Sequence, residues 1–263
     1  MTKLLWDSVG DRVYEAGVSH AVLYLEDGSA VPWNGLVSVS EQFSNKTDAV
    51  YFDGAKVMDL VTPDNFSAEI AAITYPEELL EYEGVLDSDF TKGLYFTEQI
   101  SKSFSMSYQT LVGNDVDGLG AGYQIHILYN LTAKPSNLGY DTNVDESAML
   151  FSWEVTSRPE VIAGVSPTAH LIFDSRYANP GAMDRLEELL YGTVSVDALL
   201  LSAADLFTEL TAYSVITILD NGDGTWTAIG PSDHISMPTG TTFQILNANA
   251  RFIDANRYTI SSS

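Results

Sequence analysis

Apolar and polar side chains alternate along much of this chain, and this pattern constrains the fold more than any other feature. The clearest example places Phe104, Met106 and Tyr108 on one side of an extended segment and serines on the other. Because successive side chains of a strand point to opposite faces, this is typical of a half-buried strand. Similar alternation runs through the segments 36–43, 66–75, 123–131, 149–156 and 168–174. We expect a mostly β fold with predominantly antiparallel strands.

The connections between these strands are of two kinds. Asp27 and Gly28 form a turn signal between the short apolar segments 21–25 and 30–33, which predicts a hairpin. Three other connections are long and polar, at 76–93, 112–121 and 134–147. Long ordered loops on a β scaffold usually carry function, so these should bind a ligand in a monomer or a neighbouring subunit in an assembly.

Helices are expected as a minority element. After Asn179 and Pro180, apolar residues recur at helical spacing until Gly192, which stands where a helix-terminating glycine belongs. The spacing predicts a helix near residues 181–191, flanking the β structure.

A second helix and a small module complete the predicted organisation. Ser202 with Asp205 resembles a helix N-terminus, and the apolar face that follows ends near Thr211. Strand-like segments then recur at 215–219, 225–230, 242–246 and 257–261. We therefore divide the chain into a main β domain, residues 1–210, and a small C-terminal β module, residues 211–263.

The charge restricts the partners of the chain. Its 263 residues include 36 acids and 12 bases, a formal net charge of −24. Such a surface repels phosphate, which disfavours a conventional nucleic-acid-binding protein or a peripheral protein on anionic lipid. The acids are spread along the sequence, so a folded surface must carry them. Two interpretations stay open, a device for solubility or a functional acidic face.

Compartment and redox chemistry are only partly constrained. No apolar run approaches the roughly 20 residues of a membrane span, and the N-terminal segment turns polar too early for a signal peptide. We expect a soluble, unexported protein. The chain has no cysteine, which excludes disulfides, thiolate nucleophiles and zinc sites built from cysteine.

Catalytic and metal motifs are not found. The four histidines, His20, His126, His170 and His234, are far apart and none lies in an H-E-x-x-H pattern, so no metal is predicted. His126 is interpreted as a polar histidine on a strand face.

Calcium, phosphate and hydrolase motifs are also incomplete. The Asx- and glycine-rich segments 114–118 and 220–224 lack the glutamate of an EF-hand and are interpreted as hairpin turns. The glycines that follow Asp117 have no lysine or arginine nearby to cradle phosphate, and no serine stands in G-x-S-x-G. We predict no catalytic residue, cofactor or metal, and a protein that is not an enzyme. A pair of carboxylates for glycoside hydrolysis stays open because such pairs meet in space.

Several segments carry a resemblance to a known family. They are AVLYLEDGSAVPWNGLVSVSEQ (21–42), YFDGAKV (51–57), ITYPEE (73–78), GLYFTEQ (93–99), FSMSYQTLVGNDVDG (104–118), GYQIHILYN (122–130), FSWEVTSRP (151–159) and PTAHLIFDS (167–175). In order and spacing the chain resembles the major tail proteins, or tail tube subunits, of long-tailed siphovirus-type phages that infect actinobacteria. One departure is Phe104-Ser105-Met106-Ser107-Tyr108, where a Phe-Gly-Leu-Ser-Tyr type strand is expected.

The resemblance implies a fold and a function. The expected fold is a tail-tube β-sandwich or flattened barrel with a flanking helix. Its subunits form rings, typically of six, that stack into a hollow, non-contractile tube through which phage DNA passes during ejection without specific binding. Tape measure, tail terminator and distal tail proteins are the other expected partners, and no membrane is involved. The protein would be assembled in the host cytoplasm and reside in the virion.

An acidic channel wall would let DNA slide without anchoring it. Candidate lumen-lining residues are Glu69, on a strand, and the group Glu77, Glu78, Glu81 and Glu83, although each also suits a solvated outer face. The C-terminal module would decorate the tube or contribute to a subunit interface.

Two rival functions are kept. The first is a cell-surface or host-binding β module that recognises carbohydrate through exposed loops and tryptophans. The second is a hydrolase with buried carboxylates. Trp33, Trp153 and Trp226 are expected to fill the core or an interface rather than to stack on sugar.

Overall fold

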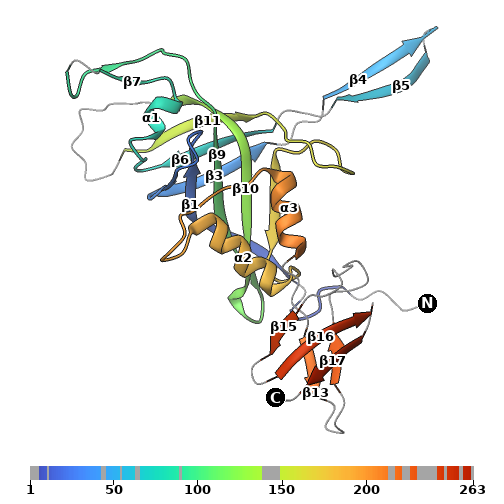
Figure 1. The fold of residues 1–263 in the computed structure, drawn as a ribbon. Helices are drawn as coiled ribbons and strands as arrows, with labels where there is room; N and C mark the ends of the chain where they lie inside the picture. The colour runs from blue at the N-terminus through green and yellow to red at the C-terminus, as the bar shows by residue number, and fades with distance from the viewer. Residues whose placement is uncertain are drawn as a thin grey trace.

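A large antiparallel sheet dominates the computed structural model of the chain, which confirms the mostly β prediction (Figure 1). The structure describes residues 6–10, 12–42, 46–53, 55–62, 66–88, 91–137, 149–212, 217–220, 226–229, 242–245, 248–254 and 257–261. Within these residues, no helix is long and apolar enough to cross a membrane.

The main sheet has the strand order β2-β1-β9-β10-β11-β6-β3, and β12 pairs with β10 outside this path. Its strands are β1 (Tyr14–Tyr24), β2 (Ala30–Pro32), β3 (Leu36–Gln42), β6 (Ser67–Ala72), β9 (Phe104–Asn114), β10 (Gly118–Asn137), β11 (Phe151–Ser157) and β12 (His170–Asp174). The predicted hairpin at Asp27 and Gly28 is confirmed as the antiparallel pair β1–β2.

Two hairpin arms and three helices accompany the sheet. The first arm is β4 (Lys46–Phe52) with β5 (Ala55–Thr62), and the second is β7 (Leu86–Asp87) with β8 (Tyr95–Phe96). The helices are α1 (Leu79–Tyr82), α2 (Pro180–Tyr191) and α3 (Ala203–Ala212). In the view of Figure 1 the two arms leave the main sheet in opposite directions.

The C-terminal strands form small sheets of their own. They are β13 (Thr217–Asp220), β14 (Trp226–Ile229), β15 (Thr242–Ile245), β16 (Ala248–Asp254) and β17 (Arg257–Ser261). The strand orders β13-β14 and β15-β16-β17 do not join the main sheet. Strand β16 was not among the predicted segments, and the predicted boundary at Thr211 falls in the last turn of α3. The turn predicted at 220–224 lies outside the described residues apart from Asp220.

Strand β10 serves two parts of the sheet. Its first half pairs with β9 and β12, and its second half pairs with β11. The register shifts between Leu128 and Leu131, where Asn130 takes a positive φ of 51°. Asparagine is among the residues that tolerate this conformation best. The irregularity therefore marks the point at which one long strand changes partners.

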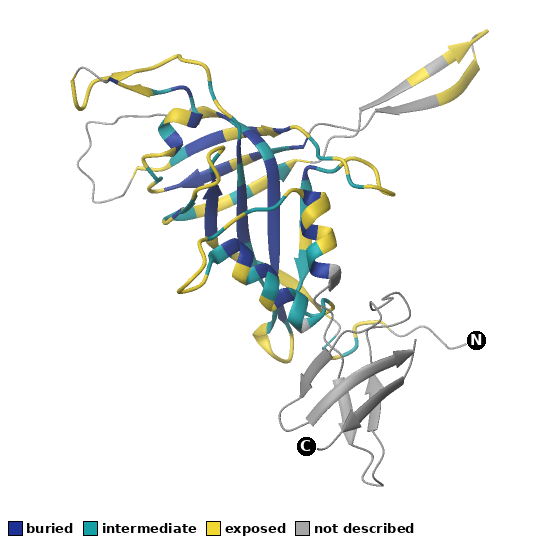
Figure 2. Cartoon of the chain, in the orientation of Figure 1, coloured by how far each residue is buried: buried dark blue, intermediate teal, exposed yellow. Residues whose placement is uncertain are grey.

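Apolar side chains form a core on each face of this strand. Met106, Leu128 and Trp153 belong to the larger cluster, which strands β1, β6, β9, β10 and β11 enclose. Ile125 and Ile127 point the other way and pack with Leu186 and Leu206 of α2 and α3. Figure 2 shows the resulting pattern, with buried strands behind the two helices. Edge strand β3 also contacts β1 at the other end of the strand order, so the sheet curls around the larger core.

This double burial corrects the prediction of a half-buried strand at 123–131. Gln124 and His126, expected on a polar face, are only 9% and 6% exposed. The reason is that the helices cover one face of β10 while the curled sheet covers the other.

Helix ends follow local chemistry and confirm both helix predictions. The Asn179 side chain accepts a hydrogen bond from the Gly181 amide at 3.0 Å, and Gly192 ends α2 with a φ of 74°. At α3, the Asp205 amide donates to Ser202 Oγ at 3.2 Å, and the Ser202 hydroxyl donates back to the Asp205 carboxylate at 2.7 Å. The first of these bonds satisfies a backbone donor that the first helical turn leaves free, and the second orients the capping hydroxyl.

The predicted long connections were partly wrong. Segment 112–121 is mostly a tight hairpin, because β9 ends at Asn114 and β10 begins at Gly118. Segment 76–93 contains α1 and β7, and in 134–147 strand β10 continues to Asn137. Residues 138–147 lie outside the described residues.

Trp153 offers a test of the larger core. It is 1% exposed and packs edge-on against Trp33 and Tyr75, with ring centroids 5.3 and 5.4 Å apart. We expect Trp153→Ala to lower the free energy of unfolding of the unassembled protein by about 3–5 kcal/mol. Trp6→Ala is the matched control, since Trp6 is 76% exposed, and should change it by less than about 0.5 kcal/mol. Urea unfolding measures both, and equal effects would contradict the assigned core.

Candidate functional site

One face of the curled sheet is polar, and none of the helices that the structure describes covers it. We call this the polar sheet face. It is formed by β3, β6, β11 and the end of β10, on the side of these strands that points away from the larger core. It consists of Ser38, Ser40, Gln42, Ser67, Glu69, Thr132, Lys134, Glu154 and Thr156. Side chains that share a face recur at every second residue, so this composition follows from the alternation in the sequence.

Two carboxylates stand opposite each other on this face. Glu154 pairs directly with Glu69 on one side and with Lys134 on the other, and Glu69 pairs with Ser40. Side chains at directly opposed positions have Cβ atoms about 4.5–5.5 Å apart, and like charges there are destabilising. The sheet therefore keeps an acidic pair that weakens it.

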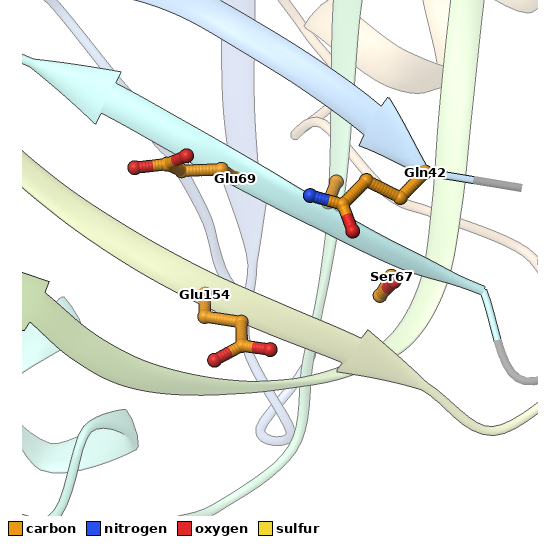
Figure 3. Close-up of a pocket in the computed structure, with 5 residues that line it drawn as sticks. Gln42, Ser67, Glu69 and Glu154 are labelled. Carbon is orange, nitrogen blue, oxygen red and sulfur yellow. The ribbon is translucent and has the colours of Figure 1, made fainter.

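A shallow hollow surrounds this pair. Gln42, Ser67, Glu69 and Glu154 line it, and Figure 3 shows them coming from three neighbouring strands. Its volume is about 150 Å³, against roughly 300–1,000 Å³ for typical ligand pockets. The hollow is too small and open to enclose a sugar or another substrate, which gives no support to a hydrolase built on these two carboxylates.

Neutralising Glu69 tests the repulsion across the sheet. Glu69→Gln removes a like-charge neighbour of Glu154 and should raise the free energy of unfolding by about 0.2–1 kcal/mol at low salt. Glu98→Gln, at an exposed position outside the sheet, gives the background effect of removing one negative charge. Lys134→Gln should act in the opposite direction. A Glu69→Gln protein no more stable than Glu98→Gln would refute the repulsive pair.

Three of the other predicted acids lie on a different surface. Glu77, Glu78 and Glu81 line an open groove of about 910 Å³ beside α1 and the β7–β8 arm. Its acidic lining residues are Glu26, Asp27, Glu77, Glu78, Glu81 and Asp87. Among the described lining residues Lys102 is the only base, and its ammonium group forms an ion pair with Glu81. The structure thus separates these acids from Glu69.

Glu83 belongs to neither surface. Its carboxylate accepts a hydrogen bond from Trp153 Nε1 at 2.5 Å, so it faces the core. Burial raises the pKa of Glu83 above the ordinary glutamate value, while the Trp153 hydrogen bond partly offsets this. Glu83 is better explained as a partner for a buried indole than as a residue that lines a channel.

The raised pKa of Glu83 gives a pH dependence with a defined sign. Because the folded state holds the proton more tightly, the stabilising effect of protonation is present below the ordinary glutamate pKa and lost as pH rises through the folded pKa. Glu83→Gln keeps an acceptor for Trp153 without the charge. Its stability relative to wild type should therefore increase from pH 4 to pH 7. Chemical unfolding at both values measures this, and Glu78→Gln, at an exposed position, is the control. A constant difference would argue against burial of the charge.

Described residues on both arms are exposed (Figure 2), and several of them are apolar. On the β4–β5 arm, Tyr51, Phe52, Val57 and Met58 are 55–77% exposed. Near the β7–β8 arm, the exposed apolar residues are Leu86, Leu94, Tyr95, Phe96 and Ile100. Several exposed apolar side chains on one protruding hairpin indicate an interaction site in a soluble protein.

Pairing of β10 with β12, together with curling of the sheet, brings Glu41, His126 and His170 together. Their ligand atoms lie within 4.8 Å of one another. Sequence reasoning missed this group because the three residues come from β3, β10 and β12 and have no motif spacing. His126 lies on a strand, as interpreted from the sequence, and its side chain is buried. His20 is exposed and lies apart from the group, and His234 lies outside the described residues.

The tryptophans considered for sugar binding are not surface platforms where the structure describes them. Trp33 is 3% exposed and donates its indole hydrogen bond to the Thr74 carbonyl at 3.0 Å, and Trp153 is 1% exposed. The side chain of Trp226 lies outside the described residues. The expectation of a core role is confirmed for Trp33 and Trp153.

Comparison with known proteins adds no family assignment. No family model matches the chain, and no curated protein sequence matches it.

Proposed function

We propose that this chain is a structural subunit that polymerises into a hollow tube, as the major tail protein of a long-tailed phage does. In the proposed assembly, stacked rings surround a channel for DNA, and the polar sheet face forms the channel wall. The resemblance noted in the sequence motivates the proposal, and two features of the fold support it.

The observation that carries the proposal is the apolar surface on the two arms. Phe52 is 77% exposed and Tyr95 is 50% exposed, and such side chains gain about 25 cal/mol for each Å² of apolar area removed from water. Because the arms leave the sheet in opposite directions, each would reach a different neighbour (Figure 1). A contact between two different patches is heterologous, and it propagates as a ring or a filament rather than closing as a dimer.

The polar sheet face suits the wall of a DNA channel. It presents hydroxyls, the Gln42 amide and the Glu69–Glu154 pair, with Lys134 as the base among its described residues. A protein that neutralises phosphates with lysine and arginine gains affinity by releasing counterions. A face with two acids and one base gains little in this way, so DNA would pass without being held.

In the proposal, the acids beside α1 form a surface that is separate from the channel wall. Glu77, Glu78 and Glu81 would give a second acidic surface near the β7–β8 arm, while Glu83 is withdrawn as a channel residue because it bonds to Trp153. The rival carbohydrate-binding function loses support, since Trp33 and Trp153 are buried.

The β4–β5 arm gives the test of assembly. Val57→Asp places a charge on the exposed apolar arm and should abolish rings and tubes, lowering polymer mass at least tenfold, because a buried unpaired charge is costly. Val161→Asp is the matched control, since Val161 is 74% exposed in the segment between β11 and β12 and should still assemble. Negative-stain electron microscopy and sedimentation velocity measure the outcome, with a tail initiator supplied if the chain needs one.

Two results would overturn the proposal. The first is a wild-type chain that stays monomeric even with an initiator. The second is a Val57→Asp chain that forms tubes as well as wild type does, which would remove the arm from the interface. Far-ultraviolet circular dichroism shows whether both variants keep the wild-type fold.

A further inference from the structure

The group formed by Glu41, His126 and His170 is nearly removed from solvent. Their side chains are 15%, 8% and 7% exposed. They come from β3, β10 and β12, and β3 is hydrogen-bonded to neither of the other two strands. Curling of the sheet alone brings the β3 carboxylate to the two imidazoles. This group differs from the exposed acidic clusters elsewhere on the subunit, because its carboxylate and two imidazoles are buried and come from separate strands.

The distances suit a single ion. His126 Nδ1 lies 3.1 Å from His170 Nε2, and Glu41 Oε1 lies 3.9 Å from His126 Nδ1. In a tetrahedral zinc site, bonds of about 2.0–2.1 Å place neighbouring ligand atoms roughly 3.3 Å apart. The two distances lie on either side of this value, and Glu41 Oε2 also lies 3.4 Å from His170 Nδ1.

From this geometry we infer that Glu41, His126 and His170 form a binding site for a divalent transition metal, of which Zn²⁺ is the best match. Two imidazoles and a carboxylate favour zinc and its neighbours over magnesium and calcium, which prefer oxygen ligands alone. Three protein ligands leave a fourth position for water or another small ligand.

Neighbouring side chains hold these ligands in place. His126 Nε2 lies 3.1 Å from Thr110 Oγ1, and the Tyr108 hydroxyl donates a hydrogen bond to Glu41. The Tyr108 ring stacks on His126, with centroids 4.6 Å apart and planes 2° apart. Metal-bound histidines usually bond through their second nitrogen to such a partner, which fixes the ring and its tautomer.

A metal-free chain of hydrogen bonds is the competing explanation. Thr110 can donate to His126, His126 to His170, and His170 Nδ1 to Glu41 Oε2 at 3.4 Å. This arrangement needs only the appropriate tautomer of each ring. The two explanations differ in one measurable property, stoichiometric uptake of metal.

The bound ion would act as a cross-link. It would tie edge strand β3 to β10 and β12, and β3 leads directly into the β4–β5 arm (Figure 1). Because an ion that binds only the folded chain stabilises it, Zn²⁺ should raise the unfolding temperature. This inference concerns the subunit itself and does not depend on tube formation.

The test uses the purified full-length chain. After treatment with EDTA, it is dialysed against Zn²⁺ in excess Mg²⁺, which occupies the many exposed carboxylates. We expect one Zn²⁺ per chain by mass spectrometry and a raised unfolding temperature. His126→Gln and His170→Gln should each weaken Zn²⁺ binding at least tenfold, whereas His20→Gln, at an exposed position, should leave it unchanged.

Binding of Co²⁺ provides a second readout. It uses the wild-type chain, so it does not require the histidine variants to fold. In the wild-type chain it should give the visible absorption of a four-coordinate site with nitrogen ligands. Less than one equivalent of Zn²⁺ at saturation, or a Co²⁺ spectrum like that of the six-coordinate aqueous ion, would overturn the inference. So would unchanged Zn²⁺ binding by a folded chain that carries both histidine substitutions.

Discussion

Burial of strand β10 on both faces is the constraint on which the rest of the structure depends. Ile125 and Ile127 pack against α2 and α3, while Met106 and Leu128 lie in the larger core on the other side. The register shift before Leu131 then lets the same strand continue beside β11. Without both layers, the long alternating strands would expose one face to water and the sheet would have no reason to curl.

Curling of the sheet also determines where charge can lie. Inside the curl, Glu41 and Glu83 each receive hydrogen bonds from an aromatic partner, and burial raises the pKa of both carboxyl groups. Outside the curl, Glu69 of β6 and Glu154 of β11 are directly opposite each other on adjacent strands, and none of the described helices covers them. A function of the exposed face would explain why the sheet keeps an acidic pair that weakens it. In the proposed tube, this function is to form the channel wall along which DNA slides.

Local chemistry made parts of this fold predictable from the sequence. Asn179 and Gly192 act within one or two turns of α2, so its ends could be predicted without knowledge of the tertiary structure. The β4–β5 arm could not be predicted in the same way. Tyr51, Phe52 and Val57 are exposed and belong to neither of the two cores formed by the described residues, so the arm lacks the alternation that a half-buried strand shows.

The candidate sites were less predictable than the fold because they depend on contacts between distant strands. The strand position of Glu69 indicated a solvated face, but Glu83 is close to the other predicted acids in sequence and bonds to Trp153 in space. Likewise, no spacing relates Glu41 to His126 and His170, and only the curl of the sheet brings them together.

A cryo-electron microscopy map of the assembled chain tests the central claim most directly. We predict stacked rings in which the arms lie between subunits and the Glu69–Glu154 pair faces the central channel. Isolated subunits, or a channel lined by lysine and arginine with this pair on the outside, would contradict the claim.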